Sequence, residues 1–246
     1  MKTTDDYVDR ETSASASQAK TLSSEVGEKL RLDILSSRLA PGTKLRLDDL
    51  KATYGVGASP LREALARLAE SRLVLSVGQR GFRVPAASPE DIMDIAMVRT
   101  EIEGLALRRS ITFGDDAWEA RVVAARHKLN LCENHHSHQV TEDIWEQRHR
   151  EFHYAIVSAC NSEWLLHLHR LLVDQFDRYR RLSAESRLPN APRPLVHQEI
   201  MDAALNRQTA KAVKLASEHI AEATNLIVSG LGATAGSKKK KTRKKT

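Results

Sequence analysis

Helical periodicity in the second half of the chain restricts the fold more than any other feature of the sequence. After Ser88, apolar residues recur three or four positions apart and form one stripe, made of Ile92, Ile95, Val98, Ile102, Leu105 and Ala106. Comparable patterns predict helices over 89–111, 115–133, 141–160, 163–185, 193–206 and 208–229. Helix-breaking proline and glycine number only 7 and 11 in 246 residues. With essentially no strand pattern in this half, we expect residues 89–230 to form an all-α bundle of about six helices.

The first half of the chain has a different order of elements. Residues 23–38 and 48–54 predict two helices, with a short strand or extended link at 43–47 between them. Ser59 followed by proline is a helix cap with proline at the first helical position, and it starts a third helix. Two short apolar runs around Gly-Gln-Arg-Gly then predict a hairpin. This order is that of a winged helix-turn-helix domain, expected over residues 21–85.

The third helix of this domain has the features of a recognition helix, whose start must face base edges in the major groove. Arg62 lies near that start and can donate two hydrogen bonds to a guanine or contact a phosphate. Residues of the hairpin tip are placed for backbone or minor-groove contacts. The expected DNA-binding residues are Arg46, Ser59, Pro60, Arg62, Arg67, Gln79, Arg80 and Gly81. A merely solvated side chain is the alternative for each arginine alone, and it is the favoured one for Arg67.

The stretch APGTKLRLDDLKATYGVGASPLREALARLAESRLVLSVGQRGFRV resembles the DNA-binding domain of GntR-family transcriptional regulators. The match includes Pro41-Gly42, Ser59-Pro60, Arg62-Glu63-Ala64-Leu65 and Arg80-Gly81-Phe82. The helical layout of the remaining chain resembles the FCD ligand-binding domain of the FadR subgroup of that family. The chain departs from the family at Gly57-Ala58-Ser59, where Ser-Arg-Thr is usual, so no operator sequence can be carried over. The resemblance implies a mostly α protein of two domains, joined by the short segment 85–89.

Two histidines, His149 and His153, lie four residues apart and therefore share one face of a predicted helix. Metal-binding FCD domains carry an Asp-x-x-x-His pair and two histidines on later helices. By this resemblance the ligand set is His149, His153, His197 and His219. Imidazole nitrogens suit Zn²⁺ or Ni²⁺ better than Mg²⁺ or Ca²⁺, so a divalent metal of the first kind is the expected cofactor. The alternative is that the histidines hold a carboxylate without a metal.

His149 stands where the family usually has aspartate. An imidazole leaves a bound metal more electropositive than a carboxylate does, which favours an anionic effector at an open coordination position. Arg99 lies where FCD domains commonly present an arginine to the effector, and a guanidinium can bind a carboxylate through two hydrogen bonds. The alternative for Arg99 is a salt bridge to Glu103, four residues further along the helix.

The resemblance implies a homodimeric repressor that binds a palindromic DNA operator and is released by a small carboxylate. Several stretches are similar to a glutarate-responsive repressor of this family, which makes a dicarboxylate such as glutarate the leading candidate effector. A transcriptional activator is one alternative, because the sign of regulation depends on where the operator lies. A metal-dependent hydrolase using the four histidines is another, but no HExxH motif or nucleophile–base pair supports it.

Charge is concentrated at the C-terminus. The net charge is +6, and the last ten residues, SKKKKTRKKT, carry seven lysines and arginines, which leaves the rest near −1. We expect a disordered basic tail over 231–246 and a disordered N-terminus over 1–20. No apolar run is long enough to cross a membrane and no secretory signal is recognisable, so a cytoplasmic location is expected. A solvated loop is expected for His135, His136 and His138, and surface or interface positions for His127, His167 and His169.

Overall fold

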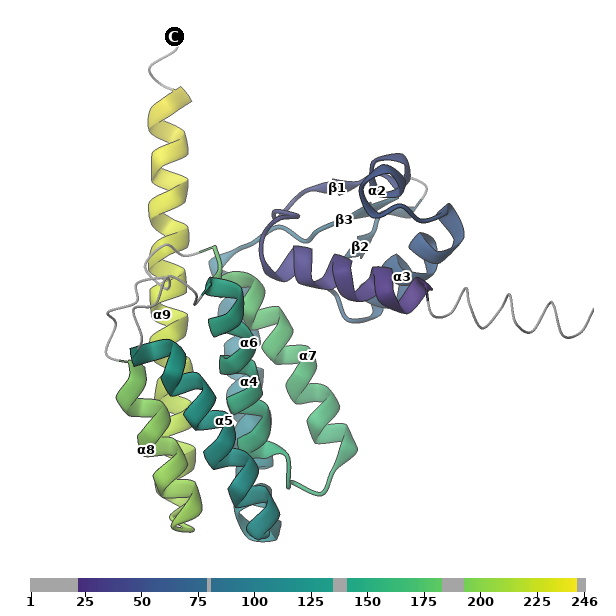
Figure 1. The fold of residues 1–246 in the computed structure, drawn as a ribbon. Coiled ribbons are helices and arrows are strands. Elements are labelled where there is room, and N and C mark those ends of the chain that lie inside the picture. The colour runs from purple at the N-terminus through teal and green to yellow at the C-terminus, as the bar shows by residue number, and fades with distance from the viewer. Residues whose placement is uncertain (1–21, 79–80, 135–140, 183–192, 243–246) are drawn as a thin grey trace, which may run out of the picture. The chain divides into compact units, whose positions relative to one another are not determined.

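The computed structural model describes residues 22–78, 81–134, 141–182 and 193–242 (Figure 1). The chain divides into two compact units, Met1–Ala87 and Ser88–Thr246, and the boundary falls within the segment 85–89 that was expected to join two domains. Among the described helices, none is long and apolar enough to cross a membrane. The predicted N-terminal tail lies outside the described residues.

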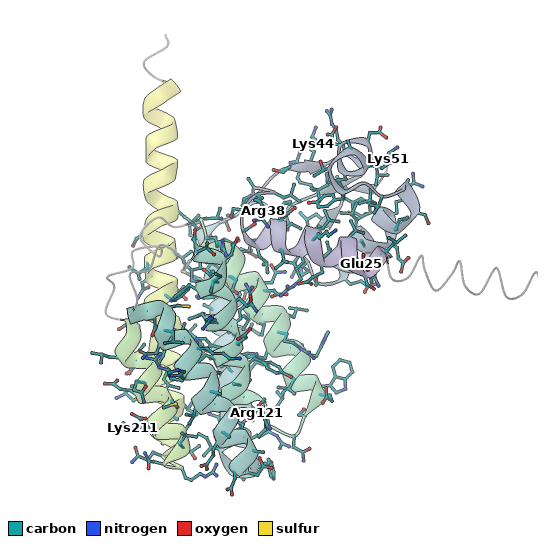
Figure 2. All side chains as sticks on the ribbon, in the orientation of Figure 1. Glu25, Arg38, Lys44, Lys51, Arg121 and Lys211 are labelled. Atoms are coloured by element: carbon teal, nitrogen blue, oxygen red, sulfur yellow. The ribbon has the colours of Figure 1, made fainter. Side chains whose placement is uncertain are left out.

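The first unit is a winged helix-turn-helix, which confirms the predicted fold class for this half. Its first helix covers residues 22–35. It continues with β1 (Lys44–Leu45), α2 (Leu47–Tyr54), α3 (Ala58–Glu70), β2 (Leu75–Ser76) and β3 (Phe82–Arg83). The strands pair antiparallel in the order β1-β3-β2, so the segment at 43–47 is a third strand of the wing sheet and not merely a link. Figure 2 shows charged side chains such as Lys44 and Lys51 on the surface of this unit.

The turn between α2 and α3 differs in one detail from the prediction. Gly55 ends α2 with a φ of 67°, a left-handed conformation that glycine adopts without steric cost. The residue that precedes α3 is Gly57 in an extended conformation, and it makes no side-chain cap. Ser59 therefore lies inside the first turn, and the prediction that it caps the helix is wrong. Pro60 lies in the first turn of α3, where backbone N–H groups have no acceptor within the helix, so its missing N–H costs no hydrogen bond.

The second unit is all-helical, and its described residues form six helices, as predicted. These are α4 (Pro89–Phe113), α5 (Asp116–Asn134), α6 (Glu142–Val157), α7 (Glu163–Arg180), α8 (Arg193–Leu205) and α9 (Thr209–Thr242). Helix α4 packs against α7 and α9, α5 packs against α6 and α8, and α8 packs against α9 (Figure 1). The interior of the bundle therefore receives side chains from helices far apart in the sequence.

Local sequence signals fix where these helices begin. The hydroxyls of Ser88, Thr141 and Ser162 each accept a hydrogen bond from a backbone N–H three residues on, which caps α4, α6 and α7.

Within the bundle, the fully buried Trp118 donates its indole N–H to the Ala155 carbonyl at 3.0 Å. That bond ties α5 to α6.

Helix α9 extends further than the sequence pattern suggested. It was expected to end at residue 229, and it continues to Thr242 through most of the segment expected to be disordered. Alanine and lysine are strong helix formers, and adding residues to a formed helix avoids the cost of nucleation. Residues 243–246 lie outside the described part of the chain.

Candidate metal centre and effector pocket

Four buried histidines converge inside the bundle, two from α6 and one each from α8 and α9. Ligand nitrogens of His149, His153, His197 and His219 all lie within 4.8 Å of one another. The Nε2 atoms of His197 and His219 are 3.2 Å apart. Two nitrogens bound to one tetrahedral zinc at about 2.1 Å are separated by about 3.4 Å. The arrangement therefore fits a single metal ion, and it brings together all four histidines that the resemblance singled out.

Two buried carboxylates orient two of these rings. Glu103 on α4 pairs with Nδ1 of His153 at 3.0 Å, and Glu133 on α5 pairs with Nδ1 of His197 at 3.1 Å. Each carboxylate also accepts a hydrogen bond from a buried arginine, Arg99 at 3.0 Å and Arg126 at 2.9 Å, respectively. A carboxylate on Nδ1 fixes the proton there and leaves the Nε2 lone pair for a metal, which is the usual support of ligating histidines.

One buried nitrogen of the cluster lacks a hydrogen-bond partner, which is consistent with a metal ligand. Nε2 of His153 is buried and makes no hydrogen bond to any described residue. A buried nitrogen lone pair without a donor is unfavourable, and coordination to a cation would satisfy it. Because Glu103 already holds the other ring nitrogen, no tautomer change supplies an alternative partner.

The four histidines are held in the neutral form that metal binding requires. Burial lowers the pKa of His149 and His219 well below the usual range, and neighbouring Arg180 and His197 respectively add to the effect. Burial also lowers the pKa of His197, against the opposing influence of Glu133. For His153, burial outweighs Glu103 and brings the pKa to about 4.

Unlike the neutral histidines, Glu103 is held in its charged form. Burial would raise the pKa of its carboxyl, but Arg99 and His153 outweigh burial and hold the pKa well below its ordinary value. Glu103 is therefore ionised, and it provides a negative charge next to the histidine cluster.

A fifth histidine lies beside this carboxylate. His169 on α7 is 2% exposed, and its Nε2 lies 3.6 Å from Glu103. The expected surface or interface position is wrong for this residue, because its helical position turns it towards α4. His127 and His167 are exposed. His135, His136 and His138 lie outside the described residues.

A pocket partly open to solvent adjoins the histidines. Helices α4, α6, α7 and α9 line it with Arg99, Trp145, His149, Phe176, Arg180, His219, Ile220 and Ala223. The guanidinium of Arg99 lies 4.6 Å from the centre of the Phe176 ring and also pairs with Glu103. Arg99 therefore forms the salt bridge to Glu103 that was the alternative in the sequence, and it also lines the pocket.

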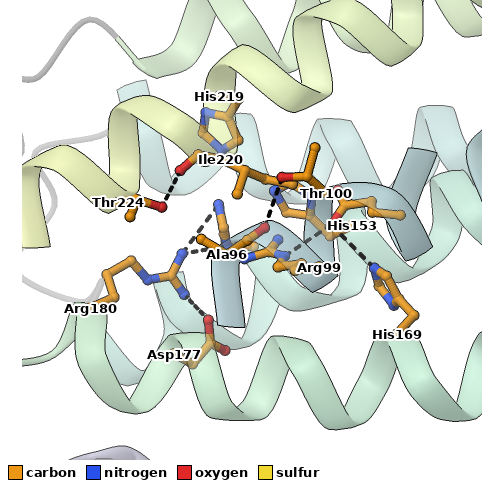
Figure 3. A network of polar contacts seen from close by, with 12 residues as sticks. Ala96, Arg99, Thr100, His153, His169, Asp177, Arg180, His219, Ile220 and Thr224 are labelled. Carbon is orange, nitrogen blue, oxygen red and sulfur yellow. Dashed lines mark hydrogen bonds and ion pairs between the residues drawn. The ribbon is translucent and has the colours of Figure 1, made fainter. Parts of the chain in front are cut away.

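Arg180 is a pocket residue that sequence reasoning missed. Its Nη1 lies 2.9 Å from Nδ1 of His149, while its Nη2 donates to Asp177 at 2.6 Å and to Glu146. Figure 3 shows Arg180 bonded to Asp177, with Arg99, His153 and His219 in the same region. In the sequence FDRYRRL nothing distinguishes Arg180 from its neighbours Arg178 and Arg181.

The described DNA-binding candidates lie on the first unit. Arg46, Ser59 and Arg62 are exposed, and Pro60 is half-buried. The opposite face of α3 buries Leu61, Ala64, Leu65 and Leu68. Gly81 has a φ of 85°, which suits the turn of the wing.

Two candidates need separate mention. Arg67 hydrogen-bonds Ser23 and lies 3.8 Å from Glu63, contacts that favour a structural role. Gln79 and Arg80 lie outside the described residues.

A winged domain joined to a helical bundle with buried histidines beside a pocket defines a class of protein, a DNA-binding regulator with a ligand-binding domain. The model for bacterial regulatory proteins of the gntR family matches residues 22–84, and the FCD domain model matches residues 94–222. The chain belongs to the GntR family and carries an FCD ligand-binding domain. It is a DNA-binding transcriptional regulator and not an enzyme.

Two curated relatives cover most of the chain. An uncharacterised transcriptional regulator, BphR of Paraburkholderia xenovorans, is 38% identical over 81% of this chain and 82% of its own. The transcriptional repressor GlaR of Escherichia coli is 36% identical over 78% of this chain and 89% of its own.

Solved structures share the fold at lower identity. A GntR regulator from Rhodococcus superposes with a TM-score of 0.69 and 24% identity over 84% of this chain and 97% of its own. McbR/YncC of Escherichia coli gives a TM-score of 0.72 and 19% identity over 84% of this chain and 96% of its own.

Proposed function

We propose that this regulator is a homodimeric repressor that binds a palindromic operator in the cytoplasm and is released by a small carboxylate. Residues 21–85 would contact DNA and residues 89–230 would bind the effector. The observation that carries the proposal is the convergence of four buried histidines next to a pocket lined by two arginines. The similarity to the transcriptional repressor GlaR supports the direction of regulation.

A divalent metal, Zn²⁺ or Ni²⁺, would be held by His149, His153, His197 and His219. When bound, it supplies a Lewis-acidic site that attracts a carboxylate oxygen. Glu103 and Glu133 keep two of the imidazoles oriented, and burial keeps all four neutral.

The proposed effector is a short dicarboxylate such as glutarate. One carboxylate would lie at the histidine cluster and the other would meet an arginine of the pocket, where Arg99 presents its guanidinium. Four imidazoles add no negative charge, so the metal's two positive charges would favour a dianion.

For DNA binding, we propose that α3 presents Ser59, Pro60 and Arg62 to the major groove. The supporting contacts would come from Arg46, Gln79, Arg80 and Gly81, whereas Arg67 is held by Ser23 and Glu63 within the domain. Arg62 is the residue most suited to read a base, because it is exposed near the start of the helix while α3 buries its opposite face.

The test is operator binding measured by fluorescence anisotropy with zinc-loaded protein and DNA from the promoter of its own gene. We expect a footprint with two-fold symmetry, and weaker binding when glutarate is added. His153→Ala and His197→Ala should abolish the response to glutarate while leaving DNA binding intact. A symmetric footprint that no short dicarboxylate weakens would contradict the proposed effector, and the absence of any palindromic footprint would contradict the repressor itself.

Metal content decides between the metal centre and the histidine-only alternative. Protein purified without a nickel column should contain about one zinc or nickel per chain by elemental analysis. Metal-free protein that still responds to glutarate would contradict the metal part of the proposal.

A further inference from the structure

Glu103 contacts both ends of the proposed effector site, one end with each carboxylate oxygen. Its Oε1 lies 3.0 Å from Nδ1 of His153, and its Oε2 accepts a hydrogen bond from Nε of Arg99 at 3.0 Å. His169 lies 3.6 Å from the same Oε2. Figure 3 shows Arg99, His153 and His169 close to one another. All four residues are at most 3% exposed, so groups from α4, α6 and α7 hold this carboxylate in one position.

The contact with His153 determines which nitrogen of the ring can meet a metal. An ionised carboxylate is an acceptor only, so a neutral His153 must carry its proton on Nδ1. The lone pair is then on Nε2, which makes no hydrogen bond to any described residue. Glu103 therefore directs the ligand nitrogen of His153 towards the other three histidines.

The contact with Arg99 leaves the end of its guanidinium available to a ligand. Among the described residues, Glu103 is the hydrogen-bond acceptor of Arg99, and it engages Nε alone. The Phe176 ring packs against the guanidinium, and Arg99 lines the pocket. Its two terminal nitrogens can therefore bind a carboxylate through parallel hydrogen bonds. Arg180, the other arginine of the pocket, already donates to two carboxylates.

A second triad of the same kind does not reach the pocket. Glu133 holds Nδ1 of His197 at 3.1 Å and accepts a hydrogen bond from Arg126 at 2.9 Å. Arg126 is not among the described residues that line the pocket. Of the two triads, the one through Glu103 therefore connects the histidine cluster to an arginine that can meet the effector.

We propose that Glu103 is a positioning residue that fixes the separation between the metal and the Arg99 guanidinium, and thereby selects the length of the dicarboxylate. This inference rests on the metal centre and the effector class proposed above and deepens both. One effector carboxylate would lie at the metal and the other at Arg99. Because one buried side chain holds both His153 and Arg99, the gap between the two carboxylate positions is rigid. A dicarboxylate one methylene shorter or longer would lose one of its two contacts.

The first test uses the wild-type protein and no effector. Nitrogen-15 NMR of the histidine rings in chelator-treated protein should show His153 with its proton on Nδ1, and this proton should remain there after zinc is added. A proton on Nε2 of His153 in zinc-free protein would overturn the inference, whatever the effector proves to be.

The second test compares Glu103→Gln with Glu133→Gln, a control that makes the same change in the other triad. Both variants should bind zinc roughly tenfold to hundredfold more weakly by competition with a chelating dye. Calorimetry at saturating zinc with succinate, glutarate and adipate then measures the length preference. Wild type and Glu133→Gln should prefer one length roughly tenfold over its neighbours, because a misplaced carboxylate loses a charge-assisted hydrogen bond. In Glu103→Gln this preference should shrink severalfold.

An unchanged length preference in Glu103→Gln would overturn the inference, and so would a wild type that binds all three lengths equally or an equal loss of preference in Glu133→Gln. Should Glu103→Gln fail to fold, Glu103→Asp keeps the charge but is one methylene shorter, so it cannot span both partners. A wild-type length preference in Glu103→Asp would again overturn the inference.

The proposed function fails in a different way. Zinc-loaded wild type that binds one of these dicarboxylates but does not release DNA would contradict the proposed function alone. If none of the three binds, the proposed effector and the length selection are both wrong.

Discussion

Two kinds of residue make up the histidine cluster. Some would bind the metal, and others orient these ligand residues through hydrogen bonds. His197 is the clearest case of an oriented ring, because its Nδ1 is held by Glu133 and its Nε2 faces His219. Glu133 lies in a helix far from both histidines in the sequence, and its own partner Arg126 fixes it in turn. The geometry of the site thus depends on residues that would never touch the metal.

Glu133→Gln should weaken zinc binding roughly tenfold to hundredfold. The amide no longer attracts the Nδ1 proton of His197, so the ring is less firmly held and its lone pair is less basic. Competition with a chelating dye measures the change. Glu119→Gln on the same helix is the control, because Glu119 pairs with Arg207 at the surface, and equal zinc affinity in both variants would contradict the role of Glu133.

His149→Asp should weaken the response to a dicarboxylate without unfolding the bundle. The added negative charge offsets part of the metal's charge and attracts Arg180, so both groups become less available to an anion. Calorimetry with glutarate should show at least a severalfold loss of affinity, and circular dichroism should show unchanged helix content. Equal or tighter glutarate binding by the variant would show that position 149 does not set the anion preference.

At the scale of elements, the close approach between α4 and α5 depends on one small residue. A Cβ on Gly114, which ends α4, would lie 2.1 Å from the Trp118 ring and 2.6 Å from the Ser110 carbonyl oxygen. Neither neighbour can retreat, because the Trp118 indole is fully buried and bonded to α6, and the carbonyl belongs to the helix backbone.

Gly114→Ala should therefore destabilise the bundle by about 2–4 kcal/mol, in the range of severe overpacking. Urea denaturation followed by circular dichroism measures the loss. Gly232→Ala is the control, since nothing lies within 4 Å of its added Cβ and alanine favours the helix. A destabilisation below about 0.5 kcal/mol for Gly114→Ala would mean that the turn relaxes more easily than this packing suggests.

The sequence predicts elements better than it predicts the partners of side chains. Apolar spacing located all six bundle helices because each must bury a stripe against the others, and Ser88 gave the start of α4 correctly. The four histidines came from resemblance, since spacing places only His149 and His153 on a common face. Glu133 and Arg180 could not be found that way, because their partners lie on other helices and tertiary packing alone brings them together.

At the scale of the whole molecule, the bundle's stability is linked to pH by its histidines. Their pKa values are lowered by burial, to about 4 for His153, whereas an unfolded histidine titrates near 6.5. Between those two values the unfolded chain binds more protons than the folded chain. The free energy of unfolding should therefore decrease as pH falls from about 6.5 to about 4.

For His153 alone the loss should reach about 3 kcal/mol. Urea denaturation of chelator-treated protein at several pH values between 7.5 and 4.5 measures it. The exposed His167 provides a control, since His167→Gln should keep the wild-type pH dependence while His153→Gln reduces it. A free energy of unfolding that stays constant over this range would contradict the buried neutral state of the cluster.

The position of Trp145 has an optical consequence. Its indole stacks on the His149 ring, with centroids 4.7 Å apart. The guanidinium carbon of Arg180 lies 5.2 Å from the centre of the Trp145 ring. The other two tryptophans are Trp118, buried in the core, and Trp164, which is 77% exposed on α7. Indole emission responds to charges and rings in contact with the indole. Occupancy of the pocket would therefore change the emission of Trp145, while Trp118 and Trp164 would contribute a constant background. The molecule thus contains its own fluorescent reporter, at the point where metal, arginine and effector would meet.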